Sequence, residues 1–309
     1  MLSCSKGETV TPELRLRPVA QNPTKADPEL SGTSLGTDNN YVVYLSASCN
    51  QQPQFMTGQL YSYISATTKW EASSDIGTAD PQYWPVAEKL DFLGLACTPA
   101  AHTALTPAWH ATTSANSVTI ADWDTYANQF DVMYAAANGQ TSASNSGTVN
   151  LAFRHTMALV CFTAQASVAG AITINGITIN DLEYEGTLTV DNSRTALTAT
   201  WSDFAAPANK LAYNLSGTTA DYAYAVTTSA AQCCQHLLVP QQAARSITIN
   251  YTMRGAVTDL DYTIHLPRTV WKAGYKYTYA LNITPTEIIV DPTVSAWDGS
   301  EVDIEFDDI

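Results

Sequence analysis

The hydrophobic pattern is clearest between Val149 and Thr163, near the middle of the chain. In the first half of this stretch, Val149, Leu151 and Phe153 recur with a period of two, which is typical of a strand with one face in a core. From Met157 onward both faces are apolar, as in a strand that is covered on both sides. A loop-like run, Asn138–Gly147, precedes the stretch. We therefore interpret Val149–Thr163 as the first strand of a second domain; a central strand of one large sandwich is the alternative.

A shorter alternating segment, Glu13–Val19, predicts a strand near the start of the chain. Leu14 and Leu16 fall on one face, and arginines fall on the other. Pro18 cannot donate a backbone hydrogen bond, so we expect pairing to end there and the strand to lie at a sheet edge. Residues 21–40 are polar and contain several Pro and Gly, which predicts a long exposed loop.

Most of the remaining chain reads as short strands separated by turn residues, with almost no helical period. One short helix is expected within residues 120–130, with Asp122 as its N-cap. The predicted strands are 41–48, 59–66, 90–97, 130–137, 171–180, 186–190, 221–226, 236–240, 246–253, 260–266 and 275–284. This pattern predicts an all-β sandwich architecture.

The length of 309 residues predicts about two domains of roughly 150 residues each. We expect residues 1–40 to hold a tether, the first strand and the exposed loop. Residues 41–147 would form an N-terminal β-sandwich domain, and residues 148–309 a C-terminal one that ends in further strands.

Composition narrows the possible functions. Charged residues make up 14% of the chain, against about 25% in an average soluble protein, and the net charge is −15. Nucleic acid is excluded as a partner, because no basic stripe exists to displace counterions from phosphates. The five histidines lack metal-ligand spacing, and no phosphate loop or nucleophile elbow is present. We therefore predict no catalytic residues, no metal and no cofactor, and we interpret His155 as a hydrogen-bonded core residue.

The six cysteines leave several readings open. Cys4, after Leu2 and Ser3, is placed like the acylated Cys of a lipoprotein; the positively charged and apolar parts of a signal are missing, so whether the precursor begins upstream of Met1 stays open. Cys49 and Cys97 could pair. The neighbours Cys233 and Cys234 could form a strained vicinal disulfide or remain two thiols on opposite faces.

Several segments, in this order and spacing, resemble the fimbrillin family, the Mfa-like and FimA-like subunits of type V pili in anaerobic Gram-negative bacteria. The similarity runs from about residue 41 to residue 297. Its segments are PQYWP (81–85), LDFLGLAC (90–97), QFDVMYAAA (129–137), VNLAFRHTMALVCF (149–162), HLLVPQ (236–241), VWKAGYKYTYALNIT (270–284) and SAW (295–297).

The resemblance implies two transthyretin-like β-sandwich domains and no catalytic residues. It also implies export as a lipoprotein, an outer-membrane anchor at Cys4, and removal of the first strand by a protease of basic specificity. A C-terminal strand of a neighbouring subunit would then fill the groove; here Val302, Ile304 and Phe306 share one face of such a donor strand. In the family the cleavage site is usually an Arg, whereas the basic residue of this segment is Lys25. Whether the chain is cleaved therefore stays open, and with it whether the chain is a stalk, tip or anchor subunit. The residues carried over as structural are Trp84, Phe92, Tyr134, Phe153, Trp271, Tyr277 and Trp297.

The sequence therefore predicts a structural or accessory subunit of a cell-surface fimbria that works in adhesion. Its expected partners are other fimbrial subunits and a ligand on a host or bacterial surface. The alternative is a surface lipoprotein that binds glycans, with Trp84, Trp109 and Trp123 as stacking platforms. A glycoside hydrolase is a more distant alternative, because no pair of carboxylates stands out.

Overall fold

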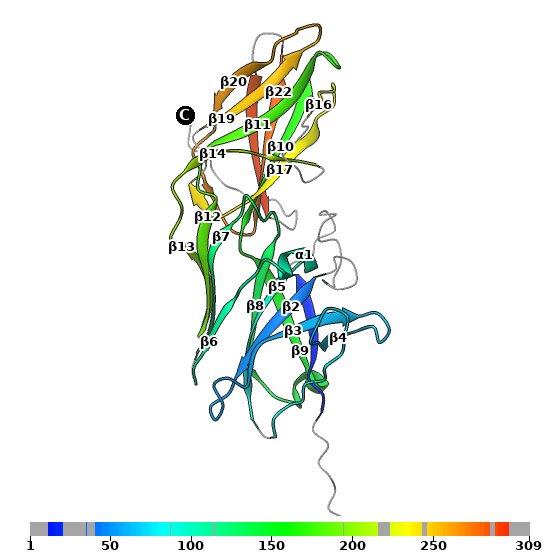
Figure 1. Ribbon diagram of the computed structural model, residues 1–309, viewed down its shortest axis with the longest axis vertical. Helices are drawn as coiled ribbons and strands as arrows, with labels where there is room; N and C mark the ends of the chain where they lie inside the picture. The colour runs from blue at the N-terminus through cyan, green and yellow to red at the C-terminus, as the bar shows by residue number, and fades with distance from the viewer. Residues whose placement is uncertain are drawn as a thin grey trace, which may run out of the picture.

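The structure, a computed structural model, describes residues 12–20, 35, 41–86, 88–113, 115–193, 195–215, 223–242, 246–284 and 288–296. Regular structure in these residues is almost entirely β, which confirms the predicted all-β class. The helix α1 (Pro99–His102) is a single turn capped by Thr98, whose side chain accepts a hydrogen bond from the Ala101 N–H, and η1 (Ser144–Gly147) is a 3-10 turn. Figure 1 shows an elongated molecule with one group of sheets at each end.

The sheet at the N-terminal end, called the barrel sheet here, has the strand order β1-β4-β3-β2-β5-β8-β9 and closes on itself. Every side chain of β2 and β5 is buried, because these strands are covered on both faces. The strands are β1 (Arg15–Ala20), β2 (Val42–Ser48), β3 (Met56–Ile64), β4 (Lys69–Ala72), β5 (Leu90–Cys97), β8 (Val132–Gln140) and β9 (Thr148–His155).

A four-stranded sheet, the covering sheet, lies along the barrel sheet in the order β13-β12-β7-β6 (Figure 1). Its inward residues, among them Val118, Ile120, Leu188 and Val190, belong to the same hydrophobic core as the barrel sheet. Its strands are β6 (Ala108–Ala111), β7 (Ala115–Asp124), β12 (Glu185–Ser193) and β13 (Ala196–Ser202).

A second hydrophobic core lies between two five-stranded sheets at the opposite end. One sheet has the order β15-β17-β10-β22-β23; the other has the order β14-β11-β19-β20, with β16 paired to β11, and β18 and β21 pair separately. These strands are β10 (Ala158–Ala166), β11 (Ile172–Leu182), β14 (Ala208–Leu211), β15 (Tyr213–Asn214), β16 (Tyr224–Ala225), β17 (Ala231–Leu238), β18 (Gln241–Gln242), β19 (Ser246–Met253), β20 (Leu260–His265), β21 (Val270–Trp271), β22 (Tyr275–Ile283) and β23 (Ile288–Ala296).

The stretch Val149–Thr163 is two strands, which corrects the single strand expected from the sequence. β9 lies in the barrel sheet, and β10 lies in a sheet of the second group, where Val160 and Phe162 face the second core and Leu159 and Cys161 face the first. Between them, the Thr156 N–H and hydroxyl both bond the Val132 carbonyl, at 3.1 and 2.6 Å, and the Gly274 N–H bonds the Met157 carbonyl at 2.9 Å. These contacts hold the chain out of the ladder at this point. β9 alternates between buried and exposed side chains, whereas the first five residues of β10 are all buried, and this change of pattern alone does not show whether one strand continues or a second begins.

Strand pairing crosses the boundary that was predicted after residue 147. β9 pairs with β8, and the hairpin β12–β13 pairs with β7 of the covering sheet. The two cores therefore do not divide at one point of the sequence: the chain enters the second core, returns to the first through β12 and β13, and leaves it again. Alternation identifies which face of a strand is buried, but it does not identify the partner strand.

The expected helix within residues 120–130 is wrong. β7 continues to Asp124, and Asp122 adopts a left-handed conformation with φ of 50°, next to a register shift against β12. The Asp124 carboxylate then accepts hydrogen bonds from the N–H groups of Tyr126 (2.7 Å) and Ala127 (2.9 Å). The polar residues taken as a helix cap thus form a bulge and a capped turn.

Candidate assembly site

β1 is a parallel partner of β9 over its whole length. The register runs from Arg15 opposite Thr148 to Ala20 opposite Phe153 without a shift. Leu14 and Leu16 are 2% and 5% exposed in the first core, whereas Arg15 and Arg17 are exposed. The alternation predicted for this segment is confirmed, and the strand inserts its leucines into the core that the barrel sheet encloses.

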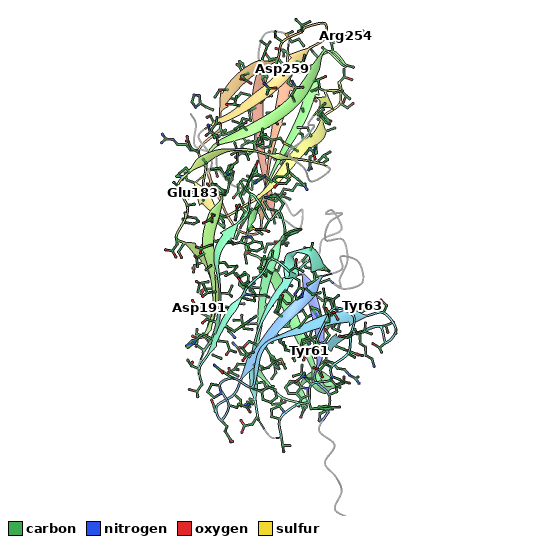
Figure 2. All side chains as sticks on the ribbon, in the orientation of Figure 1. Tyr61, Tyr63, Glu183, Asp191, Arg254 and Asp259 are labelled. Atoms are coloured by element: carbon green, nitrogen blue, oxygen red, sulfur yellow. The ribbon has the colours of Figure 1, made fainter. Side chains whose placement is uncertain are left out.

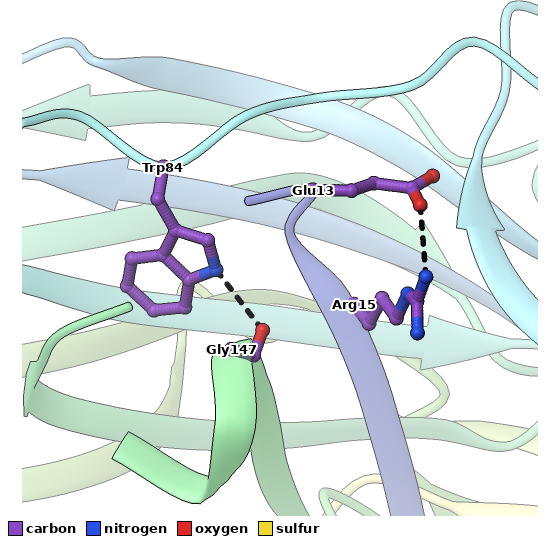
Figure 3. Close-up of polar contacts among 4 residues, drawn as sticks. All are labelled: Glu13, Arg15, Trp84 and Gly147. Carbon is purple, nitrogen blue, oxygen red and sulfur yellow. Dashed lines mark hydrogen bonds and ion pairs between the residues drawn. The ribbon is translucent and has the colours of Figure 1, made fainter. Parts of the chain in front are cut away.

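Trp84 fixes the start of β1 and the start of β9 to one another (Figure 3). Its indole Nε1 donates to the Gly147 carbonyl at 3.0 Å, and its backbone N–H donates to the Pro12 carbonyl at 3.0 Å. The ring is 2% exposed and contacts Phe92 edge-on, with ring centroids 5.8 Å apart. Glu13 and Arg15 form an exposed ion pair at 3.4 Å, also drawn in Figure 3, and such pairs contribute little to stability.

Pro18 does not end the strand, which corrects the sequence prediction; it interrupts only one edge of it. The Leu14 N–H bonds the Gln82 carbonyl at 2.7 Å, on the side away from β9. By the two-residue period, the nitrogen of Pro18 points to that same side, where it has no hydrogen to donate. β1 pairs with β4 only at Leu16, which lies opposite Trp70. The barrel sheet is therefore closed by one full interface, β1 with β9, and one very short one.

The residues predicted for anchoring, cleavage and donation lie outside the described residues: Cys4, Lys25, Val302, Ile304 and Phe306. Leu35, which lies between β1 and β2 in the sequence, is described and is fully buried in the first core. Its carbonyl accepts a hydrogen bond from the Tyr41 N–H at 3.0 Å. Leu35, which follows Lys25 in the sequence, is thus fixed in the first core, whereas β1 precedes Lys25.

The two cores are joined by a polar cluster around the buried His236 that the sequence analysis did not identify. The Gln129 amide pairs with both backbone groups of Leu237: Oε1 accepts from the Leu237 N–H at 2.8 Å, and Nε2 donates to its carbonyl at 3.1 Å. Nε2 also lies 3.2 Å from His236 Nε2. Gln129 Nε2 also donates to the Thr125 carbonyl, and the other ring nitrogen of His236, Nδ1, has no partner among the described residues.

Burial lowers the pKa of His236 to about 3, so this residue is neutral at physiological pH. The rings of Tyr126 and Tyr213 lie 5.8 and 5.3 Å from its ring. The ammonium of Lys210 lies 4.5 Å from the centre of the Tyr126 ring and 3.9 Å from that of Tyr184. Because Tyr126 and Gln129 follow β7 whereas His236 lies on β17, the cluster fixes the covering sheet to the second core.

A second glutamine makes a similar junction contact where β11 leads into β12. Gln241 Oε1 accepts from the Glu183 N–H at 3.0 Å, and its Nε2 donates to the Glu183 carbonyl at 2.6 Å. Glu183 is labelled in Figure 2, between the two groups of sheets. A Gln that pairs with backbone groups leaves no local sequence pattern, so neither Gln129 nor Gln241 could be recognised beforehand.

Nothing in the described part of the chain brings together three or more potential metal ligands. His155, predicted to be a hydrogen-bonded core residue, contacts Asp131: Nδ1 lies 2.7 Å from the carboxylate, and both side chains are nearly buried.

Cys49 and Cys97 are free thiols, so the pairing considered for them does not form. Burial raises the pKa of Cys97 to about 12. The Cys233 thiol donates to the Phe162 carbonyl at 3.3 Å. Within the same described ranges, no helix is both long and apolar enough to cross a membrane.

Two of the three tryptophans considered as glycan platforms are buried. Trp84 and Trp123 are 2% and 3% exposed, and Trp109 is half-buried with its ring against Gly58. Stacking on a sugar needs an exposed ring face, so these residues do not favour the glycan-binding alternative. The aromatic residues carried over as structural agree with their predicted role: Trp84, Phe92, Phe153, Trp271 and Tyr277 are buried, Tyr134 is half-buried against the first core, and Trp297 lies outside the described residues.

The fold is shared with solved structures of bacterial fimbrial and candidate cell-adhesion proteins. A fimbrial protein from Bacteroides vulgatus is 15% identical with a TM-score of 0.57, and the match covers 92% of this chain and 99% of that one. A candidate cell-adhesion protein from Bacteroides uniformis is 16% identical with a TM-score of 0.59, again over 92% and 99% of the two chains. At these identities the likeness shows the fold alone.

The sequence itself matches the fimbrillin-like family over residues 26–297. The chain therefore belongs to the fimbrillin-like family, and the resemblance inferred from its motifs is confirmed. No curated protein matches the chain.

Proposed function

We propose that this protein is a structural or accessory subunit of a cell-surface fimbria, a type V pilus that works in adhesion, and that it joins other fimbrial subunits by strand exchange. The observation that carries the proposal is β1, a strand from the N-terminal end that completes the first core and has only one full-length neighbour. Membership of the fimbrillin-like family supports the proposal. The role is structural and includes no catalysis.

A strand that replaces β1 must present apolar side chains at alternate positions. Leu14, just before β1, and Leu16 and Pro18 within it are buried. In the C-terminal segment, Val302, Ile304 and Phe306 have the same spacing, with acidic residues between them. Burying three such side chains contributes roughly 5–8 kcal/mol before the cost of ordering the strand. The exchanged strand would also form backbone hydrogen bonds with β9, so dissociation should be slow.

Cleavage after Lys25 would prepare this exchange. The cut would fall between β1 and Leu35, which is fixed in the first core. The new N-terminus would therefore stay attached to the barrel sheet, while β1 would be held only by its own pairing with β9. An incoming strand could then displace β1 from one end to the other without unfolding the domain.

Acylation of Cys4 would place the precursor at the cell surface, on the outer membrane. Each buried acyl CH₂ contributes about 0.8 kcal/mol, so two or three chains hold a folded domain firmly. Cys4→Ala should move the protein from the membrane fraction to the soluble fraction and abolish labelling with fatty acid. Unchanged membrane labelling of this variant would disprove the anchor without bearing on strand exchange.

We further infer that the two cores correspond to two β-sandwich domains of the transthyretin-like kind. The support is that each core lies beneath its own sheets except at β10, whose residues Leu159 and Cys161 face the first core and whose residues Val160 and Phe162 face the second. In this arrangement the first domain carries the replaceable strand, and the second carries the C-terminal strands, so that one subunit can receive a strand and donate another.

Limited digestion with trypsin followed by measurement of the intact mass tests the proposed maturation. We expect one early cut after Lys25, absent from Lys25→Gln, and polymer formation by the cut protein. A chain that ends at Asp298 should fold and be cut but should not polymerise. If the cut wild-type chain remains monomeric, or if the shortened chain polymerises as well as the full one, strand exchange through this segment is wrong.

A further inference from the structure

β13 is a sheet edge without the usual features that prevent association. Its seven residues, Ala196–Ser202, contain no charge, no Pro and no Gly. It pairs with β12 through seven consecutive residue pairs without a bulge, and it is the last strand of the covering sheet. Charges, prolines, bulges and short length are the features by which proteins normally protect sheet edges.

The other described edge strands all have such protection. β23 contains Asp291 and Pro292 at its centre, and β20 contains Asp261. β6 and β14 have four residues each, with Lys210 in β14, and β15 has two. A long, regular and uncharged edge is therefore specific to β13 among the edges that the structure describes.

The backbone of β13 presents hydrogen-bonding groups at this edge. Ser193 and Ala196 close the two-residue turn between β12 and β13, and the pairs beyond them alternate between bonded and non-bonded. The Thr200 hydroxyl contacts the Thr189 carbonyl at 3.4 Å, as expected if Thr189 and Thr200 form a bonded pair. The N–H and C=O groups of Leu197, Ala199 and Trp201 then point away from β12.

The side chains of β13 lie on two faces, and each face can pair favourably with the same face of a second, antiparallel copy of the strand. Leu197, Ala199 and Trp201 are half-buried against the first core, and the Trp201 indole donates to the Thr156 carbonyl at 2.8 Å. The residues between them, Thr198 and Thr200, are exposed. An antiparallel copy of β13 centred on Ala199 would place Leu197 opposite Trp201 and Thr198 opposite Thr200. Both kinds of cross-strand pair are favourable.

We propose that β13 is a docking edge for a second copy of this chain, which pairs with it antiparallel about Ala199 and joins two covering sheets into one continuous sheet. The uncharged edge supports a second copy as the partner: with a net charge of −15, two copies repel one another least where the strand and its side chains carry no charge. The contact is lateral and uses residues remote from β1, so it is independent of strand exchange.

Sedimentation of the uncut chain over a range of micromolar concentrations tests the contact. The wild type should form a concentration-dependent dimer. Thr198→Lys/Thr200→Lys places lysines opposite one another and should weaken dimerisation at least tenfold. The matched control, Thr187→Lys/Thr189→Lys, adds the same charge to the same face one strand further from the edge, and it should dimerise like the wild type. A wild type that is monomeric throughout, or a folded β13 variant that dimerises as well as the control, overturns the proposal.

Disulfide trapping tests the register in a Cys4→Ala background. Residues 198 and 200 of opposite copies would form a non-bonded pair with Cα atoms about 4.5 Å apart, within the range of a disulfide. Thr198→Cys and Thr200→Cys, mixed and oxidised, should give a cross-linked dimer, and each variant alone should give far less. Equal cross-linking by the mixture and by either single variant would contradict this register.

Discussion

His236→Gln tests the junction between the two cores through the pH dependence of stability. In the folded protein burial lowers the pKa of His236 to about 3, whereas an unfolded His has a pKa of about 6.5. The unfolded state therefore binds a proton that the folded state does not, and stability falls as the pH decreases from about 6.5 toward 3. Between pH 7 and pH 4.5 this single residue should remove about 2.5 kcal/mol from the free energy of unfolding.

The assay is urea unfolding of the wild type and of His236→Gln at pH 7 and pH 4.5. Carboxylates also titrate in this range, so the informative quantity is the difference between the two proteins. The variant should lose about 2.5 kcal/mol less than the wild type on acidification. His265→Gln, on the exposed strand β20, removes a histidine outside the polar cluster around His236 and should follow the wild type. If the wild type and His236→Gln lose the same free energy, His236 is not buried in its neutral form at this junction.

Two further predictions concern the first core. Trp84→Phe keeps most of the apolar bulk but leaves the Gly147 carbonyl without its 3.0 Å donor. It should therefore lower the free energy of unfolding in urea by about 1–3 kcal/mol and speed hydrogen exchange in β1. Unchanged exchange would contradict the role given to Trp84. Cys97 is fully buried, and its pKa is raised to about 12. In a Cys4→Ala background it should therefore not react with a thiol reagent at pH 8 until the protein is unfolded. Peptide mapping of the labelled protein would detect any reaction in the native state.

The strands with one buried face were predictable from the sequence, because alternation reports burial directly. Leu14 just before β1, Leu16 within it, and Leu151 and Phe153 in β9 are buried as their period indicates. The break between β9 and β10 was not predictable, because an alternating segment followed by an apolar one can also form a single strand. Thr156 leaves the ladder because its N–H and hydroxyl bond Val132, a residue distant in the sequence. Pro18 was misread because a proline interrupts one edge of a strand, and only the pairing shows which edge that is.

The contacts that join distant parts of the chain were beyond sequence reasoning for a related physical reason. The hairpin β12–β13 has ordinary strand residues, and nothing in them selects β7 as a partner. Gln129 and Gln241 act through backbone groups of Leu237 and Glu183, so the identity of the contacted residues leaves no trace in the pattern. The family motifs indicated membership of the fimbrillin-like family, whereas the proposal that β1 is exchanged could be argued only once its neighbours were known.

Competition with a synthetic peptide tests the central claim, that the groove occupied by β1 is where subunits join. The peptide covers residues 12–20 and is added in excess to trypsin-cut protein; its control carries Asp in place of Leu14 and Leu16. The native peptide should refill the groove beside β9 and stop polymer growth, and the control peptide should have no effect, because charged side chains cannot enter the core. Polymer growth that is unaffected by the native peptide would contradict the account.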